Sequence, residues 1–133
     1  MNTAINLNFE FLLRHYLPKV CRIAYEAGCS ISEFYHQNDD VEIEHKSDGS
    51  PVTIADQEAD KLICRGLRQL SDVIPMVTEE SVAQVSFAER QHWQTYWLVD
   101  PLDGTKEFIS GTGEYSVNIA LVHNHHPVLG VVY

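Results

Sequence analysis

Two aspartates in the second half of the chain carry the side chains best suited to chemistry. Asp100 and Asp103 are separated by a proline and a leucine, and they follow an apolar run over residues 96–99 that is typical of a strand. Carboxylate oxygens are the hard ligands that Mg²⁺ prefers, and Mg²⁺ keeps coordination positions for water and phosphate oxygens. Gly104 and Thr105 come next, and backbone N–H groups at the start of a helix suit a bound anion. Aspartates at strand ends also serve as helix caps or turn residues, but this segment favours a site where a metal ion meets a phosphate.

A pair of glutamates offers further oxygen ligands. Glu79 and Glu80 follow a short apolar run over residues 73–77. Such a pair usually belongs to a solvated loop, and a metal-binding role requires that its strand lies beside the strand that leads to Asp100. Because adjacent side chains on a strand point to opposite faces of the sheet, only one of the two glutamates should face the site.

Asp56 is a candidate for orienting a metal-bound water. Thr53 is predicted to cap a helix whose third residue is Asp56. An acidic side chain in this turn is stabilised by the helix dipole whether or not it has a function. The functional interpretation requires a hydroxyl partner. Thr105 is the natural candidate, because an aspartate and a threonine can together orient and deprotonate a water molecule.

Three histidines near the end of the sequence also resemble a metal cluster. His123, His125 and His126 accompany Asn124 and Pro127 in a predicted hairpin connection, where polar residues gather for structural reasons. Since a ligand count without a geometry is weak evidence for a metal, the hairpin interpretation is favoured.

The composition restricts the classes of partner. The chain has 133 residues and a net charge of −10 without a cluster of lysines or arginines, which argues against a nucleic acid polymer as ligand. Bound metal ions could supply the positive charge that a small phosphorylated substrate needs. The three cysteines show no C-x-x-C spacing, which favours a reduced, cytosolic setting. The sequence shows no signal peptide, and no apolar run approaches the ~20 residues of a membrane span.

Two amphipathic helices are predicted in the first half of the chain. The first has an apolar stripe at helical spacing, with Pro18 either in the first turn of the main helix or at a kink in a longer one. The second carries its inner face from Ala55 to Leu70. The stripe of the first helix consists of Phe9, Leu12, Leu13, Tyr16, Leu17, Val20, Ile23, Ala24, Ala27, Ile31 and Phe34.

Strands are predicted mainly in the second half. Ser116–Val122 and Val128–Tyr133 read as a pair joined by the connection Asn124–Pro127, and a polar connection without regular structure is predicted over Val82–Gln94. Helices early and strands late indicate an α+β fold, with two N-terminal helices packed on a mostly antiparallel sheet.

These residues together resemble a known family. The blocks Lys46–Asp56, Thr78–Ser81 and Trp97–Phe108 are similar, in the same order, to those of the magnesium-dependent phosphatases of the inositol monophosphatase superfamily. Glu114–Leu121 and Pro127–Tyr133 extend the similarity. The chain looks most like the bacterial 3′(2′),5′-bisphosphate nucleotidases of sulfate assimilation. Those enzymes tend to carry Lys-Glu-Phe after Asp-Gly-Thr, where inositol monophosphatases tend to carry Thr-Asn-Phe.

The resemblance implies a role for each matching residue. Glu79, Asp100, Asp103 and the backbone carbonyl of Leu102 would bind Mg²⁺, of which full-length members hold two or three ions. Asp56 and Thr105 would orient the attacking water. The phosphate and substrate contacts would come from Gly104, Thr105 and Lys106. The reaction implied is removal of the 3′-phosphate of adenosine 3′,5′-bisphosphate to give AMP and phosphate, with a cytoplasmic enzyme or one peripheral at the inner membrane.

The length of the chain departs from the family pattern. Family members are roughly twice as long, in keeping with two domains of ordinary size, and their second half supplies a further aspartate ligand and most of the nucleoside pocket. Residues 1–133 are therefore expected to form an N-terminal metal-binding phosphatase domain, with the C-terminal domain of the family absent and an exposed face prone to self-association. The alternatives are an inositol or sugar monophosphatase and a non-catalytic fragment.

Overall fold

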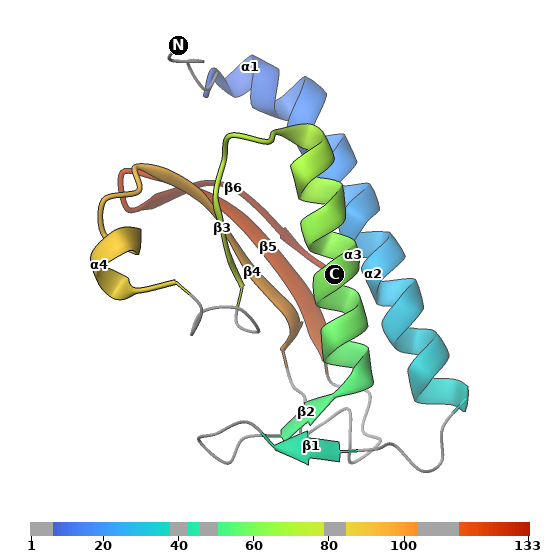
Figure 1. Ribbon diagram of the computed structural model, residues 1–133. Helices are drawn as coiled ribbons and strands as arrows, with labels where there is room; N and C mark the ends of the chain where they lie inside the picture. The colour runs from blue at the N-terminus through green and yellow to red at the C-terminus, as the bar shows by residue number, and fades with distance from the viewer. Residues whose placement is uncertain (1–6, 38–42, 46–50, 79–84, 104–114) are drawn as a thin grey trace.

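The computed structural model describes residues 7–37, 43–45, 51–78, 85–103 and 115–133. Two long helices lie side by side along one face of a twisted sheet, and a small two-stranded sheet lies near one end of that sheet (Figure 1). The helical segments are α1 (Phe9–Phe11), the π-helical turn η1 (Leu12–Tyr16), α2 (Leu17–Gln37), α3 (Ile54–Leu70) and α4 (Phe87–Arg90). The strands are β1 (Ile43–His45), β2 (Pro51–Thr53), β3 (Met76–Thr78), β4 (Thr95–Asp103), β5 (Ser116–His123) and β6 (His126–Val132).

The first helix is longer than its regular part and changes its winding just before Pro18. The backbone N–H of Leu17 donates to the carbonyl of Leu12, five residues back, which is the bonding pattern of a π-turn. Proline has no N–H and its ring clashes with the carbonyl four residues earlier, so a wider turn at this point lets the helix continue. Pro18 therefore lies in the first turn of α2, as one of the two predicted alternatives has it. It also lies inside a longer helical segment, as the other alternative has it, with a π-turn before the proline.

The core lies between the two long helices and the sheet. The stripe predicted on the first helix is largely confirmed, since Val20, Ala24, Ala27 and Ile31 are fully buried. Phe9 and Leu13 were wrongly assigned to the core, because they are 77% and 47% exposed. The other buried core residues come from the second helix, the connection after it and the sheet; they are Ala55, Ala59, Ile63, Leu67, Ile74, Trp97, Val99, Leu102, Val117, Ile119, Leu121 and Leu129.

The four-stranded sheet confirms the α+β class. Its strand order is β3-β4-β5-β6; β4 pairs antiparallel with β5, β5 pairs antiparallel with β6, and β3 pairs parallel with β4. The hairpin between β5 and β6 is tighter than predicted, because the turn consists of Asn124 and His125 alone. Both residues have positive φ, 50° and 66°, which is the backbone of a two-residue turn that matches the twist of the strands.

One short helix was missed in the segment predicted to be an irregular connection. Helix α4 begins after Ser86, whose hydroxyl accepts a hydrogen bond from the backbone N–H of Glu89 at 3.2 Å. This Ser-x-x-Glu spacing is the capping-box pattern, so the signal was present in the sequence.

The face of the sheet turned away from α2 and α3 is apolar and open among the described residues. Leu98 is 47% exposed and Val132 is 75% exposed on this side. Together with Val77, Ala120 and Gly130 they line a groove of about 600 Å³. None of the described helices is long and apolar enough to cross a membrane.

Candidate functional site

The segment that contains Asp100 and Asp103 does not follow a strand, as the sequence predicted, but lies within one. Strand β4 continues to Asp103 through an irregularity: Asp100 pairs with Asn118, whereas Asp103 pairs with Ser116. Three steps along β4 therefore correspond to two steps along β5, which places one extra residue in β4 and defines a β-bulge. A proline in a sheet is tolerated at such a bulge because it cannot donate a ladder hydrogen bond, and Pro101 occupies this position.

The bulge decides where the two carboxylates point. In a regular strand, residues three apart lie on opposite faces. Here the partner residues Asn118 and Ser116 share a face, and the amide nitrogen of Asn118 donates to the hydroxyl of Ser116 at 3.0 Å. Because opposed residues of an antiparallel pair lie on the same face, Asp100 and Asp103 also share a face. This arrangement is what a common metal site requires of the two aspartates.

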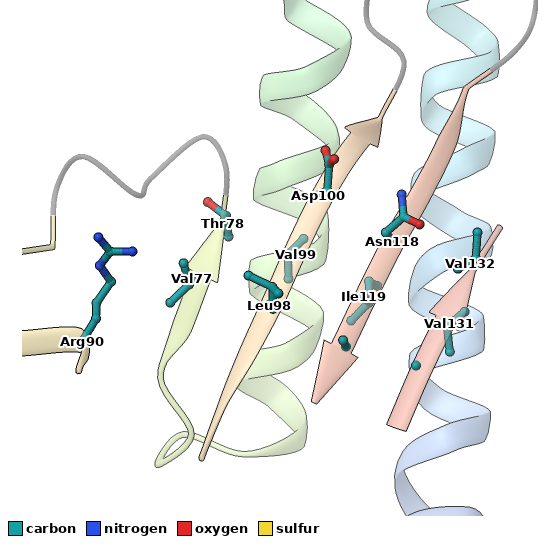
Figure 2. Close-up of a pocket in the computed structure, with 12 residues that line it drawn as sticks. Val77, Thr78, Arg90, Leu98, Val99, Asp100, Asn118, Ile119, Val131 and Val132 are labelled. Carbon is teal, nitrogen blue, oxygen red and sulfur yellow. The ribbon is translucent and has the colours of Figure 1, made fainter. Parts of the chain in front are cut away.

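The strand that leads to the glutamate pair lies beside β4. Thr78, the last residue of β3, is the Cα partner of Val99, and the two strands run parallel. Figure 2 shows Thr78, Asp100 and Asn118 at the same end of three neighbouring strands. The condition set at the sequence level for Glu79 is therefore met, although Glu79 and Glu80 themselves lie outside the described residues.

Asp56 and Leu102 are both buried. Asp56 is 2% exposed in the first turn of α3, which begins directly after Thr53 as predicted. Leu102 is 2% exposed and places its side chain in the core; its predicted contribution through the backbone carbonyl stays a prediction. Gly104, Thr105 and Lys106 lie outside the described residues. Among the part of the chain that is described, no group of three or more His, Cys, Asp or Glu side chains gathers at metal-binding distance.

Two polar residues near this end of the sheet were not anticipated. Asp60 lies one helical turn after Asp56 on α3 and makes a side-chain hydrogen bond with Thr78, which is only 1% exposed. Burial raises the pKa of Asp60, while its hydrogen bonds to Thr78 and Cys64 and the charge of Arg68 act in the opposite direction. The i, i+4 spacing of Asp56 and Asp60 was a signal in the sequence that both lie on one helix face.

The thiol of Cys64 continues this column of polar groups by one more turn. Its Sγ donates to Oδ1 of Asp60 at 3.8 Å. Burial, followed by the negative charge of Asp60, raises the pKa of Cys64 to about 11. The thiol is therefore protonated at neutral pH and serves as a weak hydrogen-bond donor rather than a nucleophile.

The contacts described for His123 and His125 are those of a strand pair and a tight turn. Nδ1 of His123 lies 2.7 Å from the hydroxyl of Thr95, a cross-strand partner on β4. His125 occupies the second position of the tight turn. Trp97 is fully buried in the core.

Comparison with known proteins identifies the family. The sequence model of the inositol monophosphatase family matches residues 13–133. The chain belongs to the inositol monophosphatase family. It is 51% identical over 117 residues to the 3′(2′),5′-bisphosphate nucleotidase CysQ of Salmonella typhimurium, which covers 88% of this chain and 47% of that protein.

Solved structures of the family share the fold. The crystal structure of CysQ from Bacteroides thetaiotaomicron matches with a TM-score of 0.72 and 41% identity, covering 92% of this chain and 43% of that one. The extragenic suppressor protein SuhB from Bartonella henselae matches with a TM-score of 0.74 and 29% identity, covering 87% of this chain and 43% of that one. The chain thus spans about half the length of the relatives it matches.

Proposed function

We propose that this chain forms the metal- and phosphate-binding half of a magnesium-dependent phosphomonoesterase that removes the 3′-phosphate of adenosine 3′,5′-bisphosphate, giving AMP and inorganic phosphate. The observation that supports it most is the β-bulge at Pro101, which turns Asp100 and Asp103 to one face at the end of β4. The similarity to CysQ nucleotidases supports the choice of reaction and of a nucleotide substrate. On this proposal the enzyme acts in the cytoplasm, in sulfur and nucleotide metabolism.

The donor set fits a hard divalent cation. Asp100 and Asp103 offer carboxylate oxygens, and Leu102 between them offers a backbone carbonyl. If the parallel register of β3 and β4 continues by one residue beyond Thr78, Glu79 joins Asp100 on the same face. We expect these four residues to hold Mg²⁺. When bound, two such ions would activate water and compensate the charge of the phosphate and of the leaving oxygen.

The remaining residues would position the reactants. Asp56 is buried at the start of α3, where a carboxylate can accept the hydroxyl proton of Thr105 and so fix the oxygen that holds the attacking water. The backbone N–H groups of Gly104 and Thr105 would donate to the phosphate oxygens. Lys106 would add a positive charge for the substrate. A chain of net charge −10 needs such local donors and cations to attract a phosphate.

The runner-up substrate class is an inositol or sugar monophosphate. The match to the inositol monophosphatase family is compatible with it. The tripeptide Lys106-Glu107-Phe108 favours the nucleotide, since bisphosphate nucleotidases tend to carry it.

The proposal can be tested with a chimera in which this chain replaces the matching half of Salmonella typhimurium CysQ. We expect release of phosphate from adenosine 3′,5′-bisphosphate in Mg²⁺, and slower release from inositol monophosphate at equal concentration. Faster turnover of inositol monophosphate would favour the runner-up class.

The metal site is tested in the same chimera with Asp103→Asn, which keeps the shape of the side chain and removes its charge. A neutral ligand should weaken metal binding and lower turnover by two orders of magnitude or more, on the order of the loss of one charge-stabilising group. A chimera with near-normal turnover after this substitution would contradict the proposed metal site. The unsubstituted 133-residue chain alone is expected to show little activity, because half of the relatives' length has no counterpart in it.

A further inference from the structure

The contact between Asp60 and Thr78 links helix α3 to the end of the sheet where the site is proposed. Thr78 is the last described residue of β3 and is 1% exposed. Its side chain lies on the helix-covered side of the sheet, because its Cα partner Val99 is a core residue. The hydroxyl of Thr78 donates to the carboxylate of Asp60, which comes from the face of α3 that packs on the sheet.

A side-chain hydrogen bond to a helix should matter more for the position of β3 than for that of β4 or β5. Among the described strands β3 is an edge strand of three residues, and β4 is its one neighbour there. β4 and β5, by contrast, have nine and eight residues and are paired on both sides. A short edge strand is held by few ladder hydrogen bonds, so a side-chain bond to a helix contributes a large share of what orders its end.

Asp60 is itself held in place by its neighbours. The thiol of Cys64 donates to its Oδ1 from one turn further along α3. The carboxylate is about half buried, and a buried charge is retained only when hydrogen bonds compensate its lost hydration. The contact between Asp60 and Thr78 thus joins α3 to β3 at the residue that precedes Glu79 in the sequence. Thr78 is also the Cα partner of Val99, the residue that precedes Asp100.

We propose that Asp60 is a positioning residue for the metal site: by accepting the hydrogen bond of Thr78, it holds the carboxyl end of β3 in register with β4 and so sets where the chain enters Glu79. The inference rests on the proposed function, because the importance of that position depends on Glu79 being a ligand. Residues that orient metal ligands typically change metal affinity by 10- to 100-fold when substituted.

The test compares substitutions that break the hydrogen bond with substitutions that keep it. Asp60→Ala and Thr78→Val each remove one partner, whereas Asp60→Asn and Thr78→Ser retain an acceptor and a donor. Glu58→Gln is the control for lost charge on the same helix, because Glu58 is exposed and pairs only with Lys61 at 3.3 Å among the described contacts. Thr78→Val, which keeps the side-chain shape, also serves where Asp60→Ala does not fold.

Two readouts are needed: amide hydrogen exchange of β3, and the affinity for Mg²⁺ measured by calorimetry on the chimera with Salmonella typhimurium CysQ. For Asp60→Ala and Thr78→Val we expect at least tenfold faster exchange at Met76–Thr78 with no change in α2, and about tenfold weaker Mg²⁺ binding. Asp60→Asn, Thr78→Ser and Glu58→Gln should remain within about twofold of the unsubstituted chain. The double variant should lose no more affinity than either single one, because both remove the same bond.

Each contrary outcome has a distinct meaning. Unchanged exchange at β3, or exchange that rises equally in α2, would overturn the positioning role and leave only a general contribution to stability. Faster exchange at β3 without a loss of Mg²⁺ affinity would also overturn it. Failure of the unsubstituted chimera to bind Mg²⁺ would refute the proposed function, while the exchange data would still decide whether Asp60 holds β3.

Discussion

Replacing Gly66 by alanine should reveal how closely the two long helices must approach. A Cβ atom at Gly66 on α3 would lie 2.8 Å from Cγ1 and 2.9 Å from Cδ1 of Ile23 on α2. Carbon atoms pack best at ~3.5–4.0 Å, so the helices or the Ile23 side chain would have to move by roughly 0.7 Å. Ile23 is only 7% exposed and its neighbours are packed core residues, so it has little space to yield.

Two opposing effects determine the size of the change. Alanine is favoured over glycine inside a helix by about 1 kcal/mol, whereas overpacking a core costs about 1–3 kcal/mol. The steric term should win, so we expect Gly66→Ala to lower the free energy of unfolding by about 1 kcal/mol. The measurement is urea unfolding followed by circular dichroism, with an unchanged m-value as evidence that the surface exposed on unfolding is the same.

A second variant separates the two effects. Ile23→Ala removes the atoms that the new Cβ would meet, at a cost of about 2–5 kcal/mol of its own. In that background Gly66→Ala should become stabilising by about 1 kcal/mol, because only the helix propensity remains. The sign reversal corresponds to a coupling energy of about 2 kcal/mol between the two positions. If Gly66→Ala stabilises the chain in both backgrounds, the close approach of α2 and α3 is refuted.

Three further predictions concern the surface and the partly buried thiol of Cys64. His125→Gly should stabilise the chain by about 0.5–1 kcal/mol in thermal unfolding, because His125 has a φ of 66° and glycine accepts this backbone without strain; a loss of stability would show that the imidazole makes a contact worth more than the strain. Cys64 should react with iodoacetamide at pH 8 at least tenfold more slowly than the exposed Cys21 and Cys29, as followed by mass spectrometry, because its pKa is about 11. Leu98→Lys should weaken self-association, because Leu98 is 47% exposed on the open apolar face. Analytical ultracentrifugation at high protein concentration should then give a lower average mass than for the unsubstituted chain; an unchanged mass would show that this face does not mediate self-association.

The helices were predictable because local pattern and tertiary contact agree there. Apolar residues recur at helical spacing along α3, and Thr53 and Asp56 mark its start, so the helix could be placed without knowledge of its neighbours. The π-turn before Pro18 was harder, since the sequence shows the conflict but not how the backbone resolves it. A wider turn and a kink can each accommodate a proline inside a helix, and Leu12 at the start of the wider turn is buried in the core.

Residue type and spacing were enough to single out Asp100 and Asp103, but not to predict that they lie within a strand, on either side of a β-bulge. The sequence indicated that the strand ends before Asp100, but β4 continues to Asp103 because its long pairing with β5 outweighs the local preference of this proline-containing segment. The parallel pairing of β3 with β4 could not be read from either strand alone, since register between distant strands is set by what the sheet buries. Thr78 and Asp60 escaped notice for the same reason: a hydrogen bond between a helix and a strand has no local signature.

The placement of acidic side chains suggests that this end of the sheet is built for binding at some expense of stability. Asp100 and Asp103 share one face at the end of β4, and Asp60 reaches the adjacent strand end through Thr78. In a chain of net charge −10, few cations are available to offset two carboxylates on one face of a strand end. Two like charges about 4 Å apart near a protein surface repel by roughly 4 kcal/mol. A divalent cation at this place would convert that repulsion into attraction, and its binding would then stabilise the folded chain by mass action. The same carboxylates that weaken the unliganded fold would thereby become the reason why the metal-bound fold persists.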